Sequence, residues 1–348
     1  MFIIGLGTAA PAEVYTQHDC WEALSRSAPF AGLSGRSRLI LQKVLTGENG
    51  IATRHLALNP LTEVFELTPD ALQARFAHHA PVLATEAAKR ALAAAACAPA
   101  DIDAVIISTC TGYLCPGLTS YVSEQLGLRP DVFGLDLVGQ GCGAAVPNLR
   151  TAEALLAAGR ANNVLSICVE VCSAAFYLDD DPGVLISACL FGDGAAAAVL
   201  SAKPAPGRRR VAWKSAWSHL APDDRELLRF EHKQGMLRNI LSPQIPPRAA
   251  AAARKLLDDS GVAAGDVRGW ILHAGGRDVL VALREALSLT ETDVQHSAAV
   301  LREYGNISSP TVLFVLERAL KDSVPGGLWW MSSFGAGFSC HGALLEVE

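Results

Sequence analysis

FGLDLVGQGCGAAVPNLRTAEALLAAG, residues 133–159, contains the pattern from which the architecture of this chain follows. Its apolar beginning predicts a strand, the glycines around Cys142 predict a tight turn, and the Ala/Leu-rich remainder has helical spacing. We therefore expect a strand–turn–helix unit with Cys142 in the first turn of the helix. A thiol there faces unpaired backbone N–H groups and the positive end of the helix dipole, which favours the thiolate. The alternative is an ordinary core cysteine.

Composition excludes several classes of protein. The chain has 348 residues, 50% of them hydrophobic and 18% charged, which is enough for two domains or one large duplicated domain. The net charge of −6 argues against nucleic acid and anionic membranes as partners. Nine cysteines without paired spacing indicate a reducing compartment. Residues 1–7 predict a strand rather than a signal peptide, and no apolar run is long enough to span a membrane, so we expect a cytoplasmic protein.

A helix followed by a strand occurs twice in the sequence, 165 residues apart. The helical stretch AAKRAL at 87–92 aligns with AARKLL at 252–257. The register continues without a gap, because APADIDAVIIS at 98–108 aligns with AAGDVRGWILH at 263–273. Two similar halves that alternate strands and helices predict an α/β duplication whose halves are related by a pseudo-twofold axis.

The boundary between the halves is expected where Pro, Gly and charge interrupt the pattern, at residues 203–210. We therefore divide the chain into an N-terminal half, 1–202, and a C-terminal half, 203–348. Phe191-Gly-Asp-Gly in the first half and Phe334-Gly-Ala-Gly in the second both precede a closing apolar strand. The three arginines at 208–210 are read as a solvated connector rather than a phosphate site.

The duplication brings three chemically useful residues together. His273 ends its strand where Ser108 ends the equivalent one; Cys142 follows Ser108 by 34 residues, and Asn306 follows His273 by 33. Cys142 and Asn306 should therefore occupy near-equivalent positions, with His273 beside them. A thiolate can attack a thioester and hold the acyl group, while an imidazole and an amide stabilise negative charge on a second thioester. The alternatives are a core imidazole for His273 and a helix cap for Asn306.

These motifs resemble those of the type III polyketide synthases, the chalcone-synthase-like family with the thiolase fold. The resemblance covers nearly the whole chain and rests on five motifs in the family's order and spacing: Val138-Gly-Gln-Gly-Cys142-Gly, Phe191-Gly-Asp-Gly-Ala, His273-Ala-Gly-Gly, Tyr304-Gly-Asn306-Ile-Ser-Ser and Phe334-Gly-Ala-Gly. Ketosynthase III enzymes share the Cys–His–Asn logic, but their histidine is usually followed by Gln-Ala-Asn. The resemblance implies a duplicated thiolase-like fold with α-β-α-β-α layers.

The resemblance also implies a role for each site residue. Cys142 would carry the acyl group, and His273 and Asn306 would bind the malonyl thioester and stabilise the enolate left when CO2 departs. Phe191 and Phe230 match the two gatekeeper phenylalanines between the entry tunnel and the cavity. The cavity-lining positions of the family fall on Cys110, Thr111, Cys172, Ala175, Ser308 and Phe334.

Cys115 matches the position from which family members reach across a dimer interface into the neighbouring cavity. The plain alternatives are core aromatics for the phenylalanines and apolar filler for the cysteines. A metal site at Cys110 and Cys115 is not expected, because no second ligand pair accompanies them. The sequence departs from the family at Glu48, where a lysine is usual for coenzyme A phosphates. Arg36, Arg38 and Lys43 would compensate for it, or an acyl carrier protein would deliver the starter.

The expected enzyme is a homodimeric acyltransferase that needs no cofactor. It would load an acyl starter on Cys142, extend it with malonyl-CoA, and release a pyrone, a resorcinol or a related phenolic. The first alternative is a ketosynthase III-like enzyme that performs a single round. The others are a cysteine acyltransferase or thioesterase, and a non-catalytic carrier-binding protein.

Overall fold

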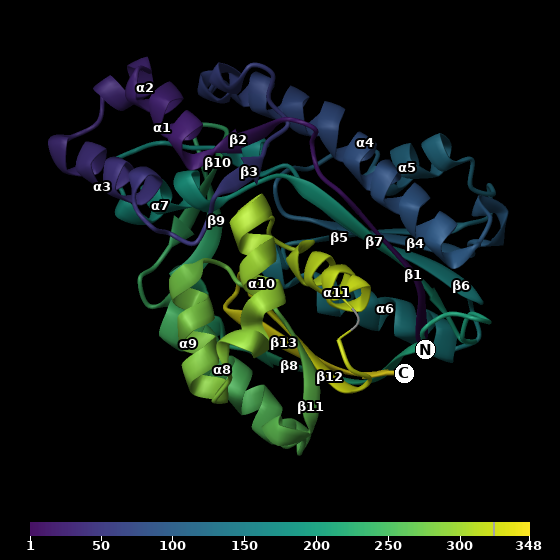
Figure 1. Cartoon of the computed structure of the whole chain (residues 1–348). Coiled ribbons are helices and arrows are strands. Elements are labelled where there is room, and N and C mark those ends of the chain that lie inside the picture. The colour runs from purple at the N-terminus through teal and green to yellow at the C-terminus, as the bar shows by residue number, and fades with distance from the viewer. Residues whose placement is uncertain (323) are drawn as a thin grey trace.

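The computed structural model describes residues 1–322 and 324–348, and within them one large mixed sheet forms the centre of the molecule (Figure 1). Its strand order is β11-β12-β13-β8-β1-β7-β6-β4-β5. In chain order these strands are β1 (Phe2–Ala9), β4 (Ala104–Thr109), β5 (Phe133–Val138), β6 (Asn163–Glu170), β7 (Gly194–Ser201), β8 (Val211–Leu220), β11 (Val267–Leu272), β12 (Gly327–Gly335) and β13 (Ser339–Val347).

The two parts of the sheet repeat the same topology, which confirms the duplication. In the first half the order β4-β6-β7-β1 contains one parallel pair followed by two antiparallel pairs. In the second half the order β11-β12-β13-β8 has the same sequence of pairings. The halves meet where β1 pairs with β8, at Phe2 and Ala212. The first half has an additional edge strand, β5, which pairs with β4.

The helices form three layers around the two parts of the sheet (Figure 1). Helices α4 and α5 cover the outer face of the first half, α6 and α11 lie in the middle, and α8 and α9 cover the outer face of the second half. The helices are α1 (Gln17–Ser25), α2 (Ala28–Ala31), α3 (Gly35–Thr46), α4 (Pro69–Ala95), α5 (Leu118–Leu126), α6 (Ala145–Ala157), α7 (Pro182–Leu190), α8 (Ile245–Ser260), α9 (Arg277–Leu287), α10 (Glu291–Tyr304) and α11 (Thr311–Lys321).

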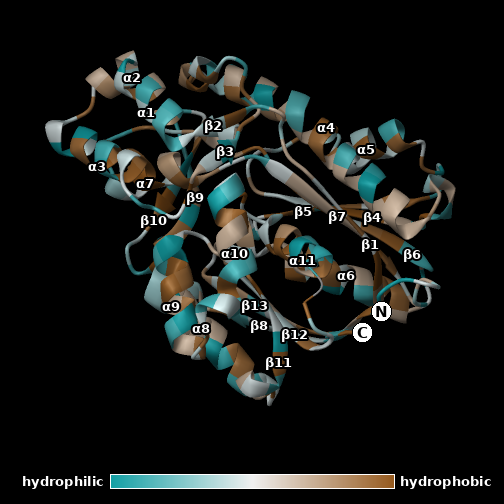
Figure 2. Ribbon diagram, in the orientation of Figure 1, coloured by the Kyte–Doolittle hydropathy of each residue, from teal (hydrophilic) through white to brown (hydrophobic). Residues whose placement is uncertain are grey.

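Consecutive strand residues face different layers, as the period of a strand requires. Ile106 packs toward α6 and Ile107 packs toward α4. In the second half Trp329 packs toward the middle layer, and Trp330 packs toward α8. Hydrophobic residues accordingly concentrate along the strands of the large sheet, whereas hydrophilic residues gather on the outward turns of the helices (Figure 2). The expected α-β-α-β-α layering is therefore confirmed.

Helix α4 begins earlier than the sequence pattern suggests. The Ala-rich pattern predicts a long helix over residues 81–98, but the helix begins at Pro69 and is capped by the Thr68 hydroxyl, which accepts from a backbone N–H at 3.2 Å. Packing compensates for the bond that Pro81 removes from the middle of the helix. A Cβ atom built on Gly7 would lie 2.4 Å from the carbonyl oxygen of Ala87, so α4 touches the backbone of β1.

Two small sheets lie outside the large one. Strands β2 (Val14–Thr16) and β3 (Thr53–His55) pair with each other, and β9 (Leu228–Lys233) and β10 (Met236–Leu241) form a hairpin. In the described residues, no helix combines the length and the apolar character that crossing a membrane requires.

Candidate active site

Cys142 lies in the tight turn that the glycines predict. The chain passes from β5 through a short 3-10 turn, η3 (Gly141–Gly143), into α6. The expected strand–turn–helix unit is therefore present, but Cys142 precedes α6 and is not in its first turn. Gly139 and Gly141 have φ angles of +82° and +56°, which glycine adopts at little cost. A Cβ atom on Gly141 would lie 2.8 Å from the backbone nitrogen of Ala336, so the close approach also requires glycine.

The second half of the chain holds this turn from the other side. The Ser333 hydroxyl donates to the carbonyl oxygen of Gly143 at 3.1 Å. A Cβ atom on Gly143 would lie 3.2 Å from the carbonyl carbon of Phe334. The turn that carries Cys142 in the first half therefore directly contacts the end of β12 in the second half, as the duplication predicts.

His273 follows the end of β11 and is almost completely buried, with 1% of its surface exposed. Its backbone N–H donates to the carbonyl oxygen of Ser332 at 2.9 Å, and its ring centroid lies 4.9 Å from that of Phe334. Within the part of the chain that the structure describes, neither ring nitrogen has a hydrogen-bond partner. Burial lowers the pKa of His273 to about 4, so the imidazole is neutral at pH 7.

Asn306 lies in the turn between α10 and α11 and connects the other two residues. Its amide nitrogen donates to the carbonyl oxygen of Gly275 at 2.8 Å, two residues after His273. Its amide oxygen accepts from the Ser308 backbone N–H at 2.9 Å. The Ser308 hydroxyl in turn donates to the Cys142 sulfur at 3.2 Å. A continuous series of contacts thus runs from the turn after His273 to Cys142, and the three residues lie together.

The protonation state of Cys142 differs from the sequence-based expectation. Burial raises its pKa to about 12, an effect that the Ser308 hydroxyl reduces and the charge of Glu170 reinforces. Burial therefore favours the thiol over the thiolate at pH 7. The sulfur thus keeps its proton until attack begins.

A cavity of about 70 Å³ with mostly apolar walls opens in front of the Cys142 sulfur. Many of the residues for which the resemblance implies substrate contact line it together with Cys142, namely Thr111, Cys172, Ala175, Phe191, Phe230 and Ser308. Walls from α1, α3 and α7 complete the cavity.

The remaining predicted substrate residues lie elsewhere around the site. Cys110 lines a second cavity, of about 390 Å³, which also contacts Gly139 beside the nucleophile turn. Phe334 is buried between His273 and Phe338, so it supports the imidazole and lines neither cavity. Cys115 is exposed and also lines neither cavity.

Glu170 is a site residue that the sequence did not reveal. It ends β6, is completely buried, and accepts from the Ser309 hydroxyl at 2.7 Å and the Thr111 hydroxyl at 2.9 Å. The Ser308 hydroxyl also lies 3.4 Å from it. Burial raises its pKa even though these donors work in the opposite direction. The sequence signal that could have indicated Glu170 is a single carboxylate at the end of an otherwise apolar strand.

Comparison with known proteins now identifies the class. The family model described as "Chalcone and stilbene synthases, N-terminal domain" matches residues 1–204, and the corresponding C-terminal domain matches residues 232–345. The chain belongs to the chalcone and stilbene synthase family and is a type III polyketide synthase, an acyltransferase. The ketosynthase III-like alternative is not favoured.

Several characterised relatives align over nearly the full chain. The 3,5-dihydroxyphenylacetyl-CoA synthase of Amycolatopsis balhimycina is 31% identical over 98% of this chain and 92% of its own length. The 1,3,6,8-tetrahydroxynaphthalene synthase of Streptomyces peucetius subsp. caesius is 32% identical over 99% of this chain and 92% of its own length. The alpha-pyrone synthesis polyketide synthase-like Pks18 of Mycobacterium tuberculosis is 28% identical over 99% of this chain and 91% of its own length.

Solved structures agree with this assignment. The crystal structure of 1,3,6,8-tetrahydroxynaphthalene synthase from Streptomyces coelicolor superimposes with a TM-score of 0.88 at 25% identity, over 99% of both chains. That of PKS-I from the brown alga Ectocarpus siliculosus superimposes with a TM-score of 0.90 at 26% identity, over 99% of this chain and 97% of its own.

Proposed function

We propose that this enzyme loads an acyl starter as a thioester on Cys142 and extends it by decarboxylative Claisen condensation with malonyl-CoA. Release of the extended chain by cyclisation would give a pyrone, a resorcinol or a related phenolic. The supporting observation is the series of hydrogen bonds that joins the turn after His273 to Cys142 through Asn306 and Ser308. The printed names of the relatives include an α-pyrone synthase-like protein and a tetrahydroxynaphthalene synthase.

Loading begins when the Cys142 sulfur attacks the carbonyl carbon of the starter thioester. The bond from that carbon to the coenzyme A sulfur breaks as the new thioester forms. Neutral His273 accepts the Cys142 proton and passes it to the departing coenzyme A thiolate, which leaves as a thiol. A thiol with a pKa of about 12 and an imidazole with a pKa of about 4 hold no charge before attack, so charge develops only during the reaction.

Extension uses the same imidazole as a hydrogen-bond donor. The His273 N–H and the Asn306 amide donate to the carbonyl oxygen of the malonyl thioester, which stabilises the enolate as CO2 leaves. Donors of this kind are each worth about 3 kcal/mol in an enclosed site. The enolate carbon attacks the Cys142 thioester, a carbon–carbon bond forms, and Cys142 departs as a thiolate that takes up a proton. No cofactor is needed for these steps, because the chain supplies the nucleophile and both donors.

A direct assay tests the proposal. Purified enzyme is incubated with malonyl-CoA and a panel of acyl-CoA starters, and the products are identified by mass. We expect CO2 release and products that contain the starter, two or more acetate units and a ring. A product with a single added acetate unit would support the ketosynthase III-like reaction instead. Thioester hydrolysis without CO2 release would indicate a thioesterase.

We further propose a homodimer built on β5. This strand forms one edge of the large sheet, and its end residues Phe133 and Val138 are 51% and 57% exposed. Unpaired, apolar sheet edges favour pairing with another strand. Tyr113 and Val138 also line the second cavity, so the Cys115 loop of a partner could approach it from this face.

We also propose that the cations of α3 receive the substrate. Exposed Arg36, Arg38 and Lys43 on α3 would contact the phosphates of coenzyme A, and Leu45 of the same helix lines the first cavity. Delivery by an acyl carrier protein would use the same cations. The boundary between the halves at residues 202 and 203 and a cytoplasmic location stay predictions.

A further inference from the structure

The hairpin β9–β10 has two faces of different character. Among the strands of residues 1–322 and 324–348, β9 and β10 pair with each other alone, and the register places Phe230 opposite Asn239 and Glu231 opposite Arg238. Residues directly opposite each other share a face, and successive residues alternate between faces. One face of the hairpin therefore carries Phe230 and Asn239, and the other carries Glu231 and Arg238.

The first of these faces forms a wall of the reaction cavity. Phe230 and Asn239 line the cavity in front of Cys142, and Phe230 also lines the second cavity. The hairpin therefore stands between the two cavities. Because the hairpin is not part of the large sheet, backbone bonds to that sheet do not fix its position. Contacts with the surrounding walls must do so, among them the close packing of Gly183 of α7 on the backbone of Leu241, and they set how much room the reaction cavity has.

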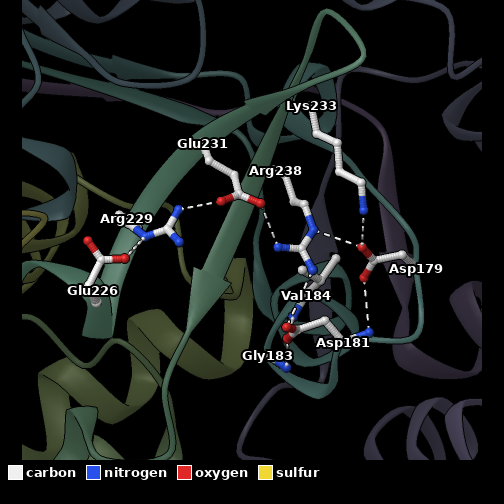
Figure 3. A network of polar contacts seen from close by, with 9 residues as sticks. All are labelled: Asp179, Asp181, Gly183, Val184, Glu226, Arg229, Glu231, Lys233 and Arg238. Carbon is white, nitrogen blue, oxygen red and sulfur yellow. Dashed lines mark hydrogen bonds and ion pairs between the residues drawn. The ribbon is translucent and has the colours of Figure 1, made fainter.

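The opposite face carries an ion-pair network centred on Arg238 (Figure 3). The Arg238 guanidinium bonds Asp179 at 2.8 Å and Glu231 at 2.8 Å. It also contacts Asp181 at 3.3 Å. Only 8% of the Arg238 surface is exposed. Lys233 adds a second cation on Asp179, at 3.3 Å.

The carboxylates at 179–181 contact two helices, α7 and α3, whose residues line the cavity. Asp181 caps α7, accepting from the Gly183 N–H at 2.8 Å. Asp180 accepts from the Ser37 hydroxyl of α3 at 2.6 Å. Residues of α7 and α3 line the same cavity as Phe230. Arg238 therefore ties the hairpin wall to the α7 and α3 walls.

This network differs from ordinary surface ion pairs, which contribute little. Arg238 is nearly buried and serves three carboxylates, so its removal would leave Asp179 to the more exposed Lys233 and Glu231 to the more exposed Arg229. Although burial opposes the ionisation of Asp179, the Arg238 guanidinium holds the pKa of that carboxyl below its usual value. The network is therefore charged at neutral pH and can hold the hairpin in one position. We call the ion pairs of Arg238 with Asp179, Asp181 and Glu231 the clamp.

We propose that Arg238 is a positioning residue that holds the hairpin β9–β10 between the two cavities and so limits the number of malonyl units added to the starter. This inference rests on the proposed function. Without the clamp, Phe230 moves with the hairpin, the two cavities merge, and the growing chain gains room for further extension before it cyclises.

The test compares the product distribution of wild-type enzyme with those of R238Q, R238K and the matched control R318Q. Arg318 pairs with Glu303 at 2.8 Å on the surface of α11 and lines neither cavity. Each enzyme receives hexanoyl-CoA and malonyl-CoA, and products are sorted by mass into successive extension numbers. We expect the ratio of longer to shorter products to rise roughly fivefold in R238Q, equivalent to about 1 kcal/mol. R318Q should match wild type. R238K should lie between, because lysine keeps the charge but loses the planar fork.

Two further measurements separate positioning from folding. Thermal melting and alkylation of Cys142 by iodoacetamide show whether a variant keeps its fold and its nucleophile. If R238Q does not fold, E231Q removes one partner only and should shift the product ratio in the same direction. A folded R238Q with the wild-type ratio, or with all products reduced equally, would overturn the inference alone. Wild-type enzyme without any malonyl-derived product would overturn the proposed function as well.

Discussion

Ser308 connects the nucleophile to the residues around it. Its hydroxyl oxygen lies 3.2 Å from the Cys142 sulfur and 3.4 Å from a Glu170 carboxyl oxygen. A hydroxyl group has one proton, so it can donate to only one of these acceptors at a time. Acylation turns the Cys142 sulfur into a weaker acceptor. We therefore expect the Ser308 proton to turn toward Glu170 once the starter is loaded.

Replacement of the nucleophile tests its role directly. The variant Cys142→Ala should reduce product formation at least about a thousandfold, because the covalent intermediate cannot form. Radiolabelled starter should no longer remain attached to the protein after precipitation. Cys97→Ala is the matched control, since Cys97 lies beyond the end of α4 and lines neither cavity. Full condensation activity in Cys142→Ala would refute the assigned role.

The pKa of Cys142 predicts how alkylation depends on pH. A pKa raised to about 12 means that the thiolate fraction is small at neutral pH and grows as the pH rises. The rate of inactivation by iodoacetamide should therefore increase about tenfold per pH unit between pH 7 and pH 9, without a plateau. A plateau reached below pH 8 would instead show that Cys142 and His273 form an ion pair in the free enzyme.

Asp193 of the Phe191-Gly-Asp-Gly turn joins three segments of the first half. Its carboxylate is fully buried and accepts from the Ala57 N–H at 2.7 Å, the Ser173 N–H at 2.8 Å and the Ser173 hydroxyl at 2.6 Å. These bonds hold the start of β7 against the loop after β3 and against the 3-10 turn η4 (Cys172–Ala175), which lines the reaction cavity.

Asp193→Asn should therefore lower the free energy of unfolding by about 2–3 kcal/mol, because an amide NH2 would face groups that are themselves donors. Urea denaturation followed by circular dichroism measures the change. Asp223→Asn, at an exposed position, is the control and should leave stability within about 0.5 kcal/mol of wild type. Equal stability of the two variants would contradict the structural role given to Asp193.

The sequence predicted elements whose signals are local. The glycines around Cys142 and the apolar run before them were sufficient for the strand and the turn, although not for the position of Cys142 before α6. The predicted start of α4 at residue 81 was wrong, because the sequence does not distinguish a proline inside a helix from a proline at its start unless the packing is known. Arg238 was missed for a different reason. Its partner Asp179 lies 59 residues away, and only the folded hairpin brings them together.

Agreement between the halves explains why the proximity of Cys142, Asn306 and the turn after His273 could be predicted from sequence. The spacing from Ser108 to Cys142 nearly equals that from His273 to Asn306, and a shared ancestral topology makes such spacings equivalent in space. Departures from symmetry were not predictable in this way. In the described residues the first half has the edge strand β5, whereas β11 is the last strand of the sheet in the second half.

The proposed homodimer predicts the mass of the enzyme in solution. Wild-type protein should sediment at about twice the 36.6 kDa of the chain. Phe133→Glu places a charge on the β5 edge and should shift the equilibrium toward the monomer, because like charges would meet where the two edges pair. Leu39→Glu, at a 67% exposed position on α3, is the control and should leave the mass unchanged. A monomeric wild-type enzyme would exclude the dimer.

The two ends of the large sheet differ in a way that limits assembly. Strand β11 is buried along its length apart from Arg268, whereas β5 is largely open to solvent. A molecule with one covered and one exposed sheet edge has a single site for self-association through its sheet. A twofold contact between the exposed edges of two copies buries both of those edges. Growth into fibrils requires two exposed edges on every molecule. The presence of one exposed edge would therefore join two copies and also prevent the addition of a third.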